Sequence, residues 1–416
     1  MRIVEESQPT SRAPRRRLHR RPIPRQTEMG RRRRTIAMLA MALGAFALGT
    51  TEFTSMGLLP LIAADFGVSE DTASTIISAY ALGVVVGAPG VAALTAKLPR
   101  RRLILILLGL IVAGNLASVA ATSYPVLLGA RFVAGLPHGA YFSVAMLATA
   151  SMSPPAQRGR ALAFVVTGLT VATIVGVPLA QVLGQNLGWH AAYGVVAVIA
   201  LVAIGGLWIA MPHMTQMAAS SICQEFSVFS KGQVWLTLLI GVTGFAGMFA
   251  VYTYITWIMT KDAGLPEGWM WLILMIFGGG MTAGNWLGGR LADWNVEKGL
   301  VLSVAALAVA LIAFYFSTAH VIPATVFFTL IGVFGMALQP SLQVRLLDHA
   351  GEAQTLAAAL NQSALNTANA GGAAVGGLVV GAGLGFGSPA LAGAVLSVIA
   401  VVLCVVAARL ARSSAR

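Results

Sequence analysis

Two formally charged residues lie inside long apolar segments of the sequence, where they could take part in proton transfer. Glu52 stands in FALGTTEFTSMGLLPLI, residues 46–62, and Arg131 stands in GARFVAGLPHGAYFS, residues 129–143. A charge at the centre of a bilayer costs at least about 2.5–3.5 kcal/mol, so each must be neutralised, paired or hydrated. Burial raises the pKa of a carboxyl group and a nearby cation lowers it. A carboxyl group under both influences could bind and release a proton near physiological pH.

Glu52 and Arg131 are expected at similar heights in the outer half of a membrane. Glu52 stands about ten residues before the end of its apolar run, which is roughly 15 Å of helix. Arg131 stands about six residues after the start of its run, which is roughly 9 Å. We therefore expect an interaction between them, direct or through water, in which Glu52 binds the proton and Arg131 sets the pKa of the Glu52 carboxyl group.

A stripe of amide side chains could bind an organic molecule. Gln362, Asn366 and Asn369 recur at i, i+4 and i+7 and share one helical face, and Asn361 flanks them. Because amide groups are costly in lipid, the stripe should face either an internal cavity or another helix. The sequence favours neither alternative over the other.

Aromatic and polar side chains in other apolar segments extend this set. The remaining candidates for the lining of a cavity are Tyr80, His138, Tyr252, Tyr254 and Gln339. His138 follows Pro137, so it could carry a second proton or satisfy backbone groups that the proline frees. Such a lining suits an amphipathic or cationic organic molecule, or a sugar, better than an inorganic ion.

The elements that position these residues must be membrane helices. The 416-residue chain is 57% hydrophobic and 10% charged with a mean hydropathy of +0.81, whereas soluble domains carry roughly 25% charged residues. Cys223 and Cys404 match no disulfide framework or metal spacing. GGRLADWNVEKG lacks the ending of a phosphate-binding loop, and no Ser–His–Asp set is evident. We expect no enzyme activity, no cofactor and no metal.

Hydropathy predicts an all-α membrane protein with twelve transmembrane helices. They cover about 36–62, 72–96, 103–122, 125–150, 160–184, 190–211, 233–259, 269–291, 299–318, 321–344, 356–383 and 388–409. With both termini cytoplasmic, 25 Lys and Arg residues fall inside and one, Lys261, falls outside. This bias is the signature of the predicted topology.

The net charge of +13 is concentrated at the N-terminus and favours a membrane partner over a nucleic acid. Residues 1–34 hold 12 Arg and 3 Glu, and RRRR directly precedes the first apolar run. This tail is predicted to be disordered and cytoplasmic, with its arginines facing anionic lipid. The apolar run that follows is too long for a signal peptide, so we expect it to be retained as the first span.

Two halves of six helices are related by an internal repeat with an offset of 197 residues. The loop sequence AALTAKLPRR at 92–101 falls on GRLADWNVEK at 289–298. The predicted bundles cover residues 35–211 and 233–410, joined by a cytoplasmic linker at 212–232 and followed by a short tail at 411–416. The offset places Phe249 opposite Glu52 and Phe328 opposite Arg131. Only one half carries the two charges, although both halves are expected to share one fold. This asymmetry favours a role in function over a role in building the fold.

The loop sequences resemble those of the major facilitator superfamily. GRLAD at 289–293 matches the motif between spans 8 and 9, in which Asp293 and Gly289 are expected to latch one conformation. The first copy departs from the pattern, with Ala92, Ala96 and Pro99 in place of Gly, Asp and Gly. It keeps the basic residues Lys97, Arg100 and Arg101. Arg131 matches the buried arginine of the span-4 motif.

Span 5 resembles the antiporter motif of the same superfamily. Small residues recur every four positions at Gly168, Ala172, Gly176, Ala180 and Gly184, with Pro178 nearby and GVP in place of the usual GP. Such a stripe lets two helices approach closely and shear past one another, or merely pack. GTTEF at 49–53, followed by GLLPLIAADFGVS, is similar to the drug:proton antiporter-1 subfamily.

This resemblance implies the major facilitator fold and a secondary active transporter in the inner membrane of a bacterium. The expected function is proton-coupled efflux of small organic molecules or drugs by alternating access. A proton-coupled sugar or metabolite permease is the first alternative, and a non-transporting receptor or scaffold is the second. Expected partners are a small-molecule substrate, protons and the lipid bilayer, with a monomer as the oligomeric state.

Overall fold

The computed structural model describes residues 30–95, 98–153, 158–212, 227–351 and 354–413. Within these residues the chain is mostly helical. The fourth, fifth and seventh predicted spans are each divided into two or more helical segments. The first half consists of α1 (Arg31–Phe66), α2 (Glu70–Thr95), α3 (Arg100–Val119), α4 (Tyr124–Gly135), α5 (His138–Met152), α6 (Arg158–Val171), the π-helix η2 (Ala172–Gly176), α7 (Val177–Leu187) and α8 (Trp189–Ala210). The second half consists of α10 (Gly232–Trp257), η4 (Ile258–Asp262), α11 (Met270–Trp294), α12 (Val296–Ser317), α13 (Val321–Ala350), α14 (Gln354–Gly381) and α15 (Ser388–Ser413), with the short turns η3 (Ser227–Ser230) and η5 (Glu267–Trp269).

These helices form the twelve predicted spans. α4 and α5 are two parts of the fourth span, because Pro137 has no N–H group to continue the helix. α6, η2 and α7 form the fifth span, and α10 continues into η4 as the seventh. Nine helices of the described part are long and apolar enough to cross a membrane by themselves. The prediction of an all-α membrane protein with twelve spans is confirmed.

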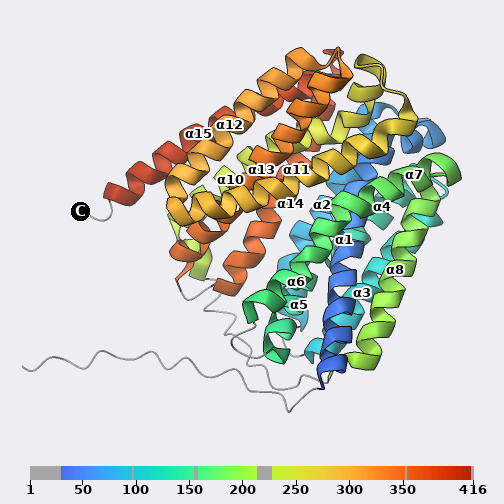
Figure 1. Ribbon diagram of the computed structural model, residues 1–416, viewed down its shortest axis with the longest axis vertical. Coiled ribbons are helices and arrows are strands. Elements are labelled where there is room, and N and C mark those ends of the chain that lie inside the picture. The colour runs from blue at the N-terminus through green and yellow to red at the C-terminus, as the bar shows by residue number, and fades with distance from the viewer. Residues whose placement is uncertain (1–29, 96–97, 154–157, 213–226, 352–353, 414–416) are drawn as a thin grey trace, which may run out of the picture.

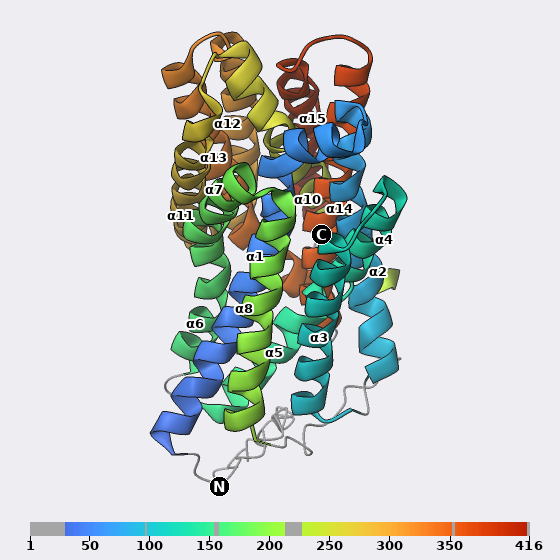
Figure 2. The same cartoon turned by 90° about the vertical axis from the view of Figure 1, so that its right-hand side faces the viewer.

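The two halves form separate bundles that meet at one end (Figure 1). At that end Lys261 Nζ lies 3.2 Å from Glu70 Oε1, and Thr256 Oγ1 donates to the carbonyl of Gly57 over 3.2 Å. The bundles separate toward the ends where α1 begins and α15 finishes (Figure 1), which the arginine and lysine bias assigns to the cytoplasm. Figure 2 shows α1 and α8 side by side along the first bundle.

Some predicted boundaries differ from the helix ends. α1 begins at Arg31, so the last four residues of the predicted tail are helical, whereas residues 1–29 lie outside the described residues. α8 ends at Ala210 and α10 begins at Gly232, and residues 213–226 of the predicted linker, with Cys223, are outside the description as well. Helix α15 continues to Ser413 into the predicted C-terminal tail.

Glycines allow α11 and α13 to pack backbone against backbone. A Cβ atom on Gly280, Gly284 or Gly288 would overlap a carbonyl oxygen of α13, that of Val333 in the case of Gly284. The predicted motif residue Gly289 is one position out of phase with this stripe and faces open space. Close approach of helices through small residues is a general device in membranes.

Replacing Gly284 with valine is therefore expected to destabilise the second bundle. The new side chain would meet backbone atoms that cannot rotate away, and overpacking of this kind costs about 1–3 kcal/mol or more. Gly289→Val is the matched control, because it makes the same change where a Cβ has room. Thermal unfolding of the two purified variants should show a large loss for Gly284→Val alone, and equal melting temperatures would contradict the packing argument.

Candidate functional site

Helix α1 carries Glu52 to the middle of the first bundle. The side chain is only 4% exposed, and Oε2 lies 3.8 Å from Nε2 of His138. Oε1 has no hydrogen-bond partner among the described residues. The next residue, Phe53, stacks on Tyr252 of α10 at a centroid distance of 5.8 Å, so this part of α1 adjoins the second bundle. Glu52 is therefore a buried carboxyl group next to the contact between the halves.

His138 is brought to Glu52 by the break in the fourth span. It is the first residue of α5 and is 1% exposed. Its Nδ1 atom lies 2.9 Å from the hydroxyl oxygen of Tyr80 on α2, and its ring leans on that of Phe142. The two ring nitrogens thus face Tyr80 and Glu52. In the described structure the His138 side chain therefore contacts Tyr80 and Glu52. There it does not satisfy the backbone groups that Pro137 frees.

Arg131 binds the residue that precedes Glu52 and not Glu52 itself. Its guanidinium group donates to the Thr51 carbonyl over 2.7 Å and to the Thr51 hydroxyl over 3.0 Å. The Thr51 hydroxyl donates in turn to Oδ1 of Asn115 over 2.7 Å. The expected direct interaction with Glu52 is absent from the ion pairs of the described residues. Successive residues of a helix point about 100° apart, so an arginine that faces residue 51 turns away from residue 52.

Two aromatic rings complete the surroundings of the Arg131 guanidinium group. The carbon of that group lies 4.8 Å from the ring centroid of Tyr80 and 4.8 Å from that of Tyr193 on α8. The Tyr193 hydroxyl lies 2.8 Å from that of Ser55. A cation between two aromatic faces is stabilised by the ring quadrupoles. Tyr80 therefore contacts both His138 and Arg131.

The second half presents aromatic rings at the corresponding height. Phe249 and Phe328, which the repeat places opposite Glu52 and Arg131, are buried. Phe249 stacks on Phe53 at 6.5 Å, and Phe328 stacks on Phe277 at 4.1 Å. Tyr252 lies between these pairs, 4.6 Å from Phe277. Among the described residues of this region, the carboxyl and imidazole groups, Glu52 and His138, belong to the first half.

The amide candidates divide into two groups. Nδ2 of Asn361 donates to Oε1 of Gln343 over 2.5 Å, which fits the interhelical alternative. Asn366 donates only to the carbonyl of Gln362 on its own helix, and its Oδ1 has no partner in the described structure. Asn369 is 1% exposed and neither polar atom of its amide has a partner there.

Asn369 lies next to a contact between α14 and α2. The hydroxyl of Ser78, two residues before Tyr80, donates to the carbonyl of Ala370 over 3.3 Å. Gln339 also leaves its amide oxygen without a partner among the described residues. Tyr254 lies elsewhere, since its ring packs near Gly376 and Gly377 toward the end where the bundles meet.

The fifth span packs on α1 through its small residues. A Cβ atom on Gly168 would overlap the Ala42 carbonyl, and one on Gly176 would overlap the Thr50 hydroxyl. The π-helix η2 begins between them at Ala172 and ends at Gly176, and the Val177 amide that follows it donates to the carbonyl of Ala172. Pro178 follows directly and has no amide hydrogen, which accounts for the local change of hydrogen-bond pattern.

η2 also reaches the other bundle. A Cβ atom on Gly278 of α11 would overlap the Thr173 carbonyl. The stripe thus packs within the first half, as the packing alternative expects, while the π-helix contacts the second half.

The predicted loop latch is not formed as expected. Asp293 is exposed and takes part in no ion pair of the described residues. Glu297, one turn further, pairs instead with Arg345. In the first copy, Arg101 donates to the Trp208 carbonyl and lies over its ring. Arg100 is the first residue of α3, and Lys97 lies outside the described residues.

Four residues of this structure were missed in the sequence. Thr51, Asn115 and Tyr193 hold Arg131 directly or at one remove. Asn115 could have been found by the signal used for span 11, which is an amide side chain in an apolar run. Arg345 is 1% exposed, although the sequence placed it in a cytoplasmic loop just beyond the tenth span.

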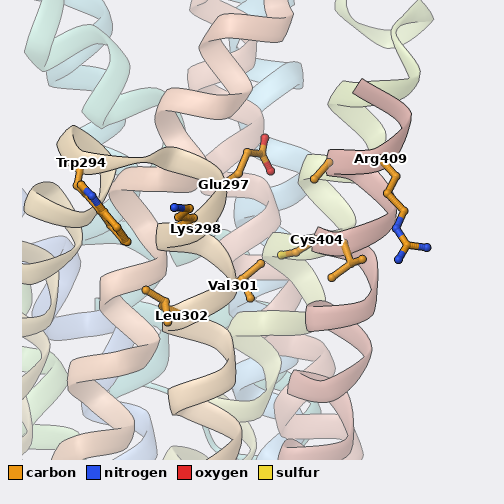
Figure 3. A pocket seen from close by; sticks show the side chains of 9 residues that line it. Trp294, Glu297, Lys298, Val301, Leu302, Cys404 and Arg409 are labelled. Carbon is orange, nitrogen blue, oxygen red and sulfur yellow. The ribbon is translucent and has the colours of Figure 1, made fainter. Parts of the chain in front are cut away.

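A groove of about 440 Å³ lies between α12 and α15, and Glu297, the partner of Arg345, is part of its lining (Figure 3). Its lining includes Val301, Leu302 and Cys404, together with Lys298 on α12 and Arg409 on α15. It contains none of the predicted site residues.

Comparison with known proteins identifies the family. Residues 41–358 match the model of the Major Facilitator Superfamily. The chain is 36% identical over 372 residues to the inner membrane transport protein YdhP of Escherichia coli strain K12, covering 89% of this chain and 96% of that protein. It is 35% identical over 354 residues to the chloramphenicol resistance protein of Streptomyces lividans, covering 84% and 89%.

A solved structure supports the same fold. A bacterial homolog of the human lysosomal transporter Spinster, in an inward-facing and unoccupied conformation, superposes with a TM-score of 0.75. The alignment covers 91% of this chain and 98% of that one at 14% identity. The resemblance seen in the loop and span motifs is confirmed. This chain belongs to the Major Facilitator Superfamily and is a multi-pass membrane transporter, not an enzyme.

Proposed function

We propose that this transporter exports small organic molecules across the bacterial inner membrane in exchange for protons, with Glu52 as the proton carrier. The observation that carries the proposal is the burial of the Glu52 carboxyl group beside the contact between the bundles, with no lysine or arginine paired to it in the described structure. The names of two relatives, an inner membrane transport protein and a chloramphenicol resistance protein, support this location and this substrate class.

The position of Glu52 makes its protonation state a conformational signal. A neutral carboxyl group can remain at the apolar contact that Phe53 makes with Phe249 and Tyr252. An ionised group needs water or a counter-charge, because a bare charge in this environment is costly. Loss of the proton therefore favours a conformation in which Glu52 is hydrated or meets a cationic substrate. Proton and substrate then compete for one site, which is the requirement for exchange.

Arg131 has a positioning role in this proposal. By binding both polar groups of Thr51, it fixes the turn of α1 that carries Glu52. We propose that the substrate contacts the amide of Asn369, which has no partner among the described residues, and the ring of Tyr252, which stacks on Phe53 beside Glu52. Tyr80, Gln339 and Asn366 are further candidates for the same cavity.

Proton release from acidified inside-out vesicles tests the proposal. A pH-sensitive dye would follow the gradient while lipophilic cations, phenicols and sugars are added one at a time. At least one cation or phenicol should discharge the gradient with the wild type and lose this effect completely with Glu52→Gln. Glu267→Gln is the matched control, because it makes the same change at an exposed carboxyl group. A wild-type response from Glu52→Gln would show that another group carries the proton.

A further inference from the structure

His138 is a buried titratable residue that the proposal above leaves unused. The other histidines of the described residues, His190, His320 and His349, are half-buried or exposed. Of these four described histidines, His138 alone has a carboxyl oxygen within 4.0 Å of a ring nitrogen, that of Glu52 at 3.8 Å. A solvent-inaccessible imidazole beside a carboxyl group with a free oxygen atom is an arrangement for sharing a proton.

We propose that Glu52 and His138 share the transported proton as one coupled pair, and that Tyr80 holds the imidazole ring in place. The inference rests on the proposed function, because it adds a second proton-binding group to the site of Glu52. It makes His138 a carrier of the proton, whereas Tyr80 is a positioning residue.

The contacts of His138 define two states in which the imidazole ring is neutral. In the first, Nδ1 carries the hydrogen and donates it to the Tyr80 oxygen, so the lone pair of Nε2 faces a protonated Glu52. In the second, the Tyr80 hydroxyl donates to Nδ1, and Nε2–H faces an ionised Glu52. Both are compatible with the 2.9 Å contact to Tyr80 and the 3.8 Å contact to Glu52.

One proton separates these two states. From the first, the O–H bond of Glu52 breaks and an N–H bond forms at Nε2, which gives a carboxylate beside an imidazolium group. When the site is hydrated, the N–H bond at Nδ1 then breaks as a water molecule accepts its proton and becomes hydronium, and the Tyr80 hydroxyl turns to donate to the emptied nitrogen. The net change is the loss of one proton from the pair. It can enter at one end of the pair and leave at the other.

The charges around His138 favour its imidazolium form only during this step. The guanidinium group of Arg131 on α4 lies over the ring of Tyr80, whose hydroxyl contacts His138. A fixed positive charge therefore lies against the same tyrosine side chain as the imidazole ring. Tyr193 on α8, Tyr141 on α5 and Tyr252 on α10 are the other titratable groups of the neighbouring helices, and all are buried. Glu52 is thus the anion available to compensate a charged His138 among the described residues of this site. The imidazolium group is favoured only while Glu52 is ionised.

The separation of the pair couples the transfer to motion. At 3.8 Å the two atoms are beyond direct hydrogen-bond range, so transfer needs an approach of about 1 Å or a bridging water. His138 begins α5 directly after the helix break at Pro137, where the backbone is least constrained by helical hydrogen bonds. Movement at this break would open or close the proton path.

Infrared difference spectroscopy of the purified full-length protein tests the pair without any substrate. The band of the protonated Glu52 carboxyl group is identified by its loss in Glu52→Gln and is then followed as a function of pH. Groups that interact by more than about one pK unit titrate in two shared steps. We expect two steps in the wild type and a single step in His138→Gln. Tyr80→Phe should keep two steps with altered midpoints, because it removes the hydroxyl that holds the ring.

His190→Gln is the matched control, because it makes the same change at a histidine that stacks on Trp189 and has no carboxyl oxygen within 4.0 Å of its ring among the described residues. It should titrate as the wild type does. A His138→Gln protein that keeps the wild-type titration would overturn the coupled pair and leave Glu52 as a lone carrier. If no carboxyl band responded to Glu52→Gln at any pH, the proposed carrier itself would be wrong. Should His138→Gln fail to yield folded protein, the wild-type titration would decide the matter, because a single step there would overturn the pair.

Discussion

Replacing Arg131 with methionine is expected to abolish proton-driven transport without destabilising the protein. The guanidinium group is fully buried, and its partners are the Thr51 carbonyl and hydroxyl and two aromatic faces, not a carboxylate. Exchanging buried ionic groups for well-packed apolar ones of similar size is often neutral or stabilising. The loss of two hydrogen bonds to a charged donor opposes this gain by a similar amount. We expect the free energy of unfolding to change by less than about 2 kcal/mol.

Transport depends on the position of α1 and should respond much more strongly to Arg131→Met. Without the guanidinium group, the turn that carries Thr51 and Glu52 loses its link to α4. A displacement of about 1 Å at a reacting group can cost 100-fold in rate, so we expect at least that loss of substrate-driven proton release.

Arg131→Lys keeps the charge but not the two-pronged geometry, and should fall between methionine and the wild type. The checks are thermal unfolding of the purified variants and the vesicle assay. Arg131→Met protein that transported normally would remove Arg131 from the mechanism. Protein that unfolded several degrees earlier would make it a structural residue instead.

Much of this architecture could be predicted from the sequence, because lipid imposes a strong constraint on composition. Each span must be about 20 apolar residues long, so hydropathy places the helices to within a few residues. The same constraint makes Glu52 and Arg131 conspicuous. Both were found because a charge in an apolar run has few explanations.

Contacts between helices were harder to predict, because they depend on rotation about each helix axis. Arg131 and Glu52 lie at similar heights, yet the arginine meets Thr51, which points about 100° away from Glu52. The same uncertainty separates Gly289, which the loop motif suggested, from Gly288, which packs on α13. His138 reaches Glu52 only because the fourth span is broken at Pro137, and hydropathy carries no information on such a break.

Replacing Arg345 with methionine should have the opposite consequence to the same change at Arg131. The Arg345 side chain is also buried, but it donates to Glu297 on α12 over 2.8 Å and to Thr237 and Gln233 on α10 over 2.8 and 3.0 Å. It therefore ties α13 to two other helices of the second bundle. Its removal leaves the amide oxygen of Gln233 and the carboxylate of Glu297 without their donors.

Breaking a buried ion pair costs about 3–5 kcal/mol. The Glu297 side chain is 38% exposed, and solvent screening places Arg345→Met at the lower end, about 3 kcal/mol. The measurement is the free energy of unfolding of the purified variants in detergent. Combining Arg345→Met with Glu297→Leu should recover part of the loss, because the uncompensated carboxylate is then gone as well. Equal stabilities of Arg345→Met and Arg131→Met would show that a carboxylate partner does not distinguish the two arginines. A loss confined to Arg345→Met would mean that the second bundle depends on its buried charge for stability and that the first bundle keeps its own for transport.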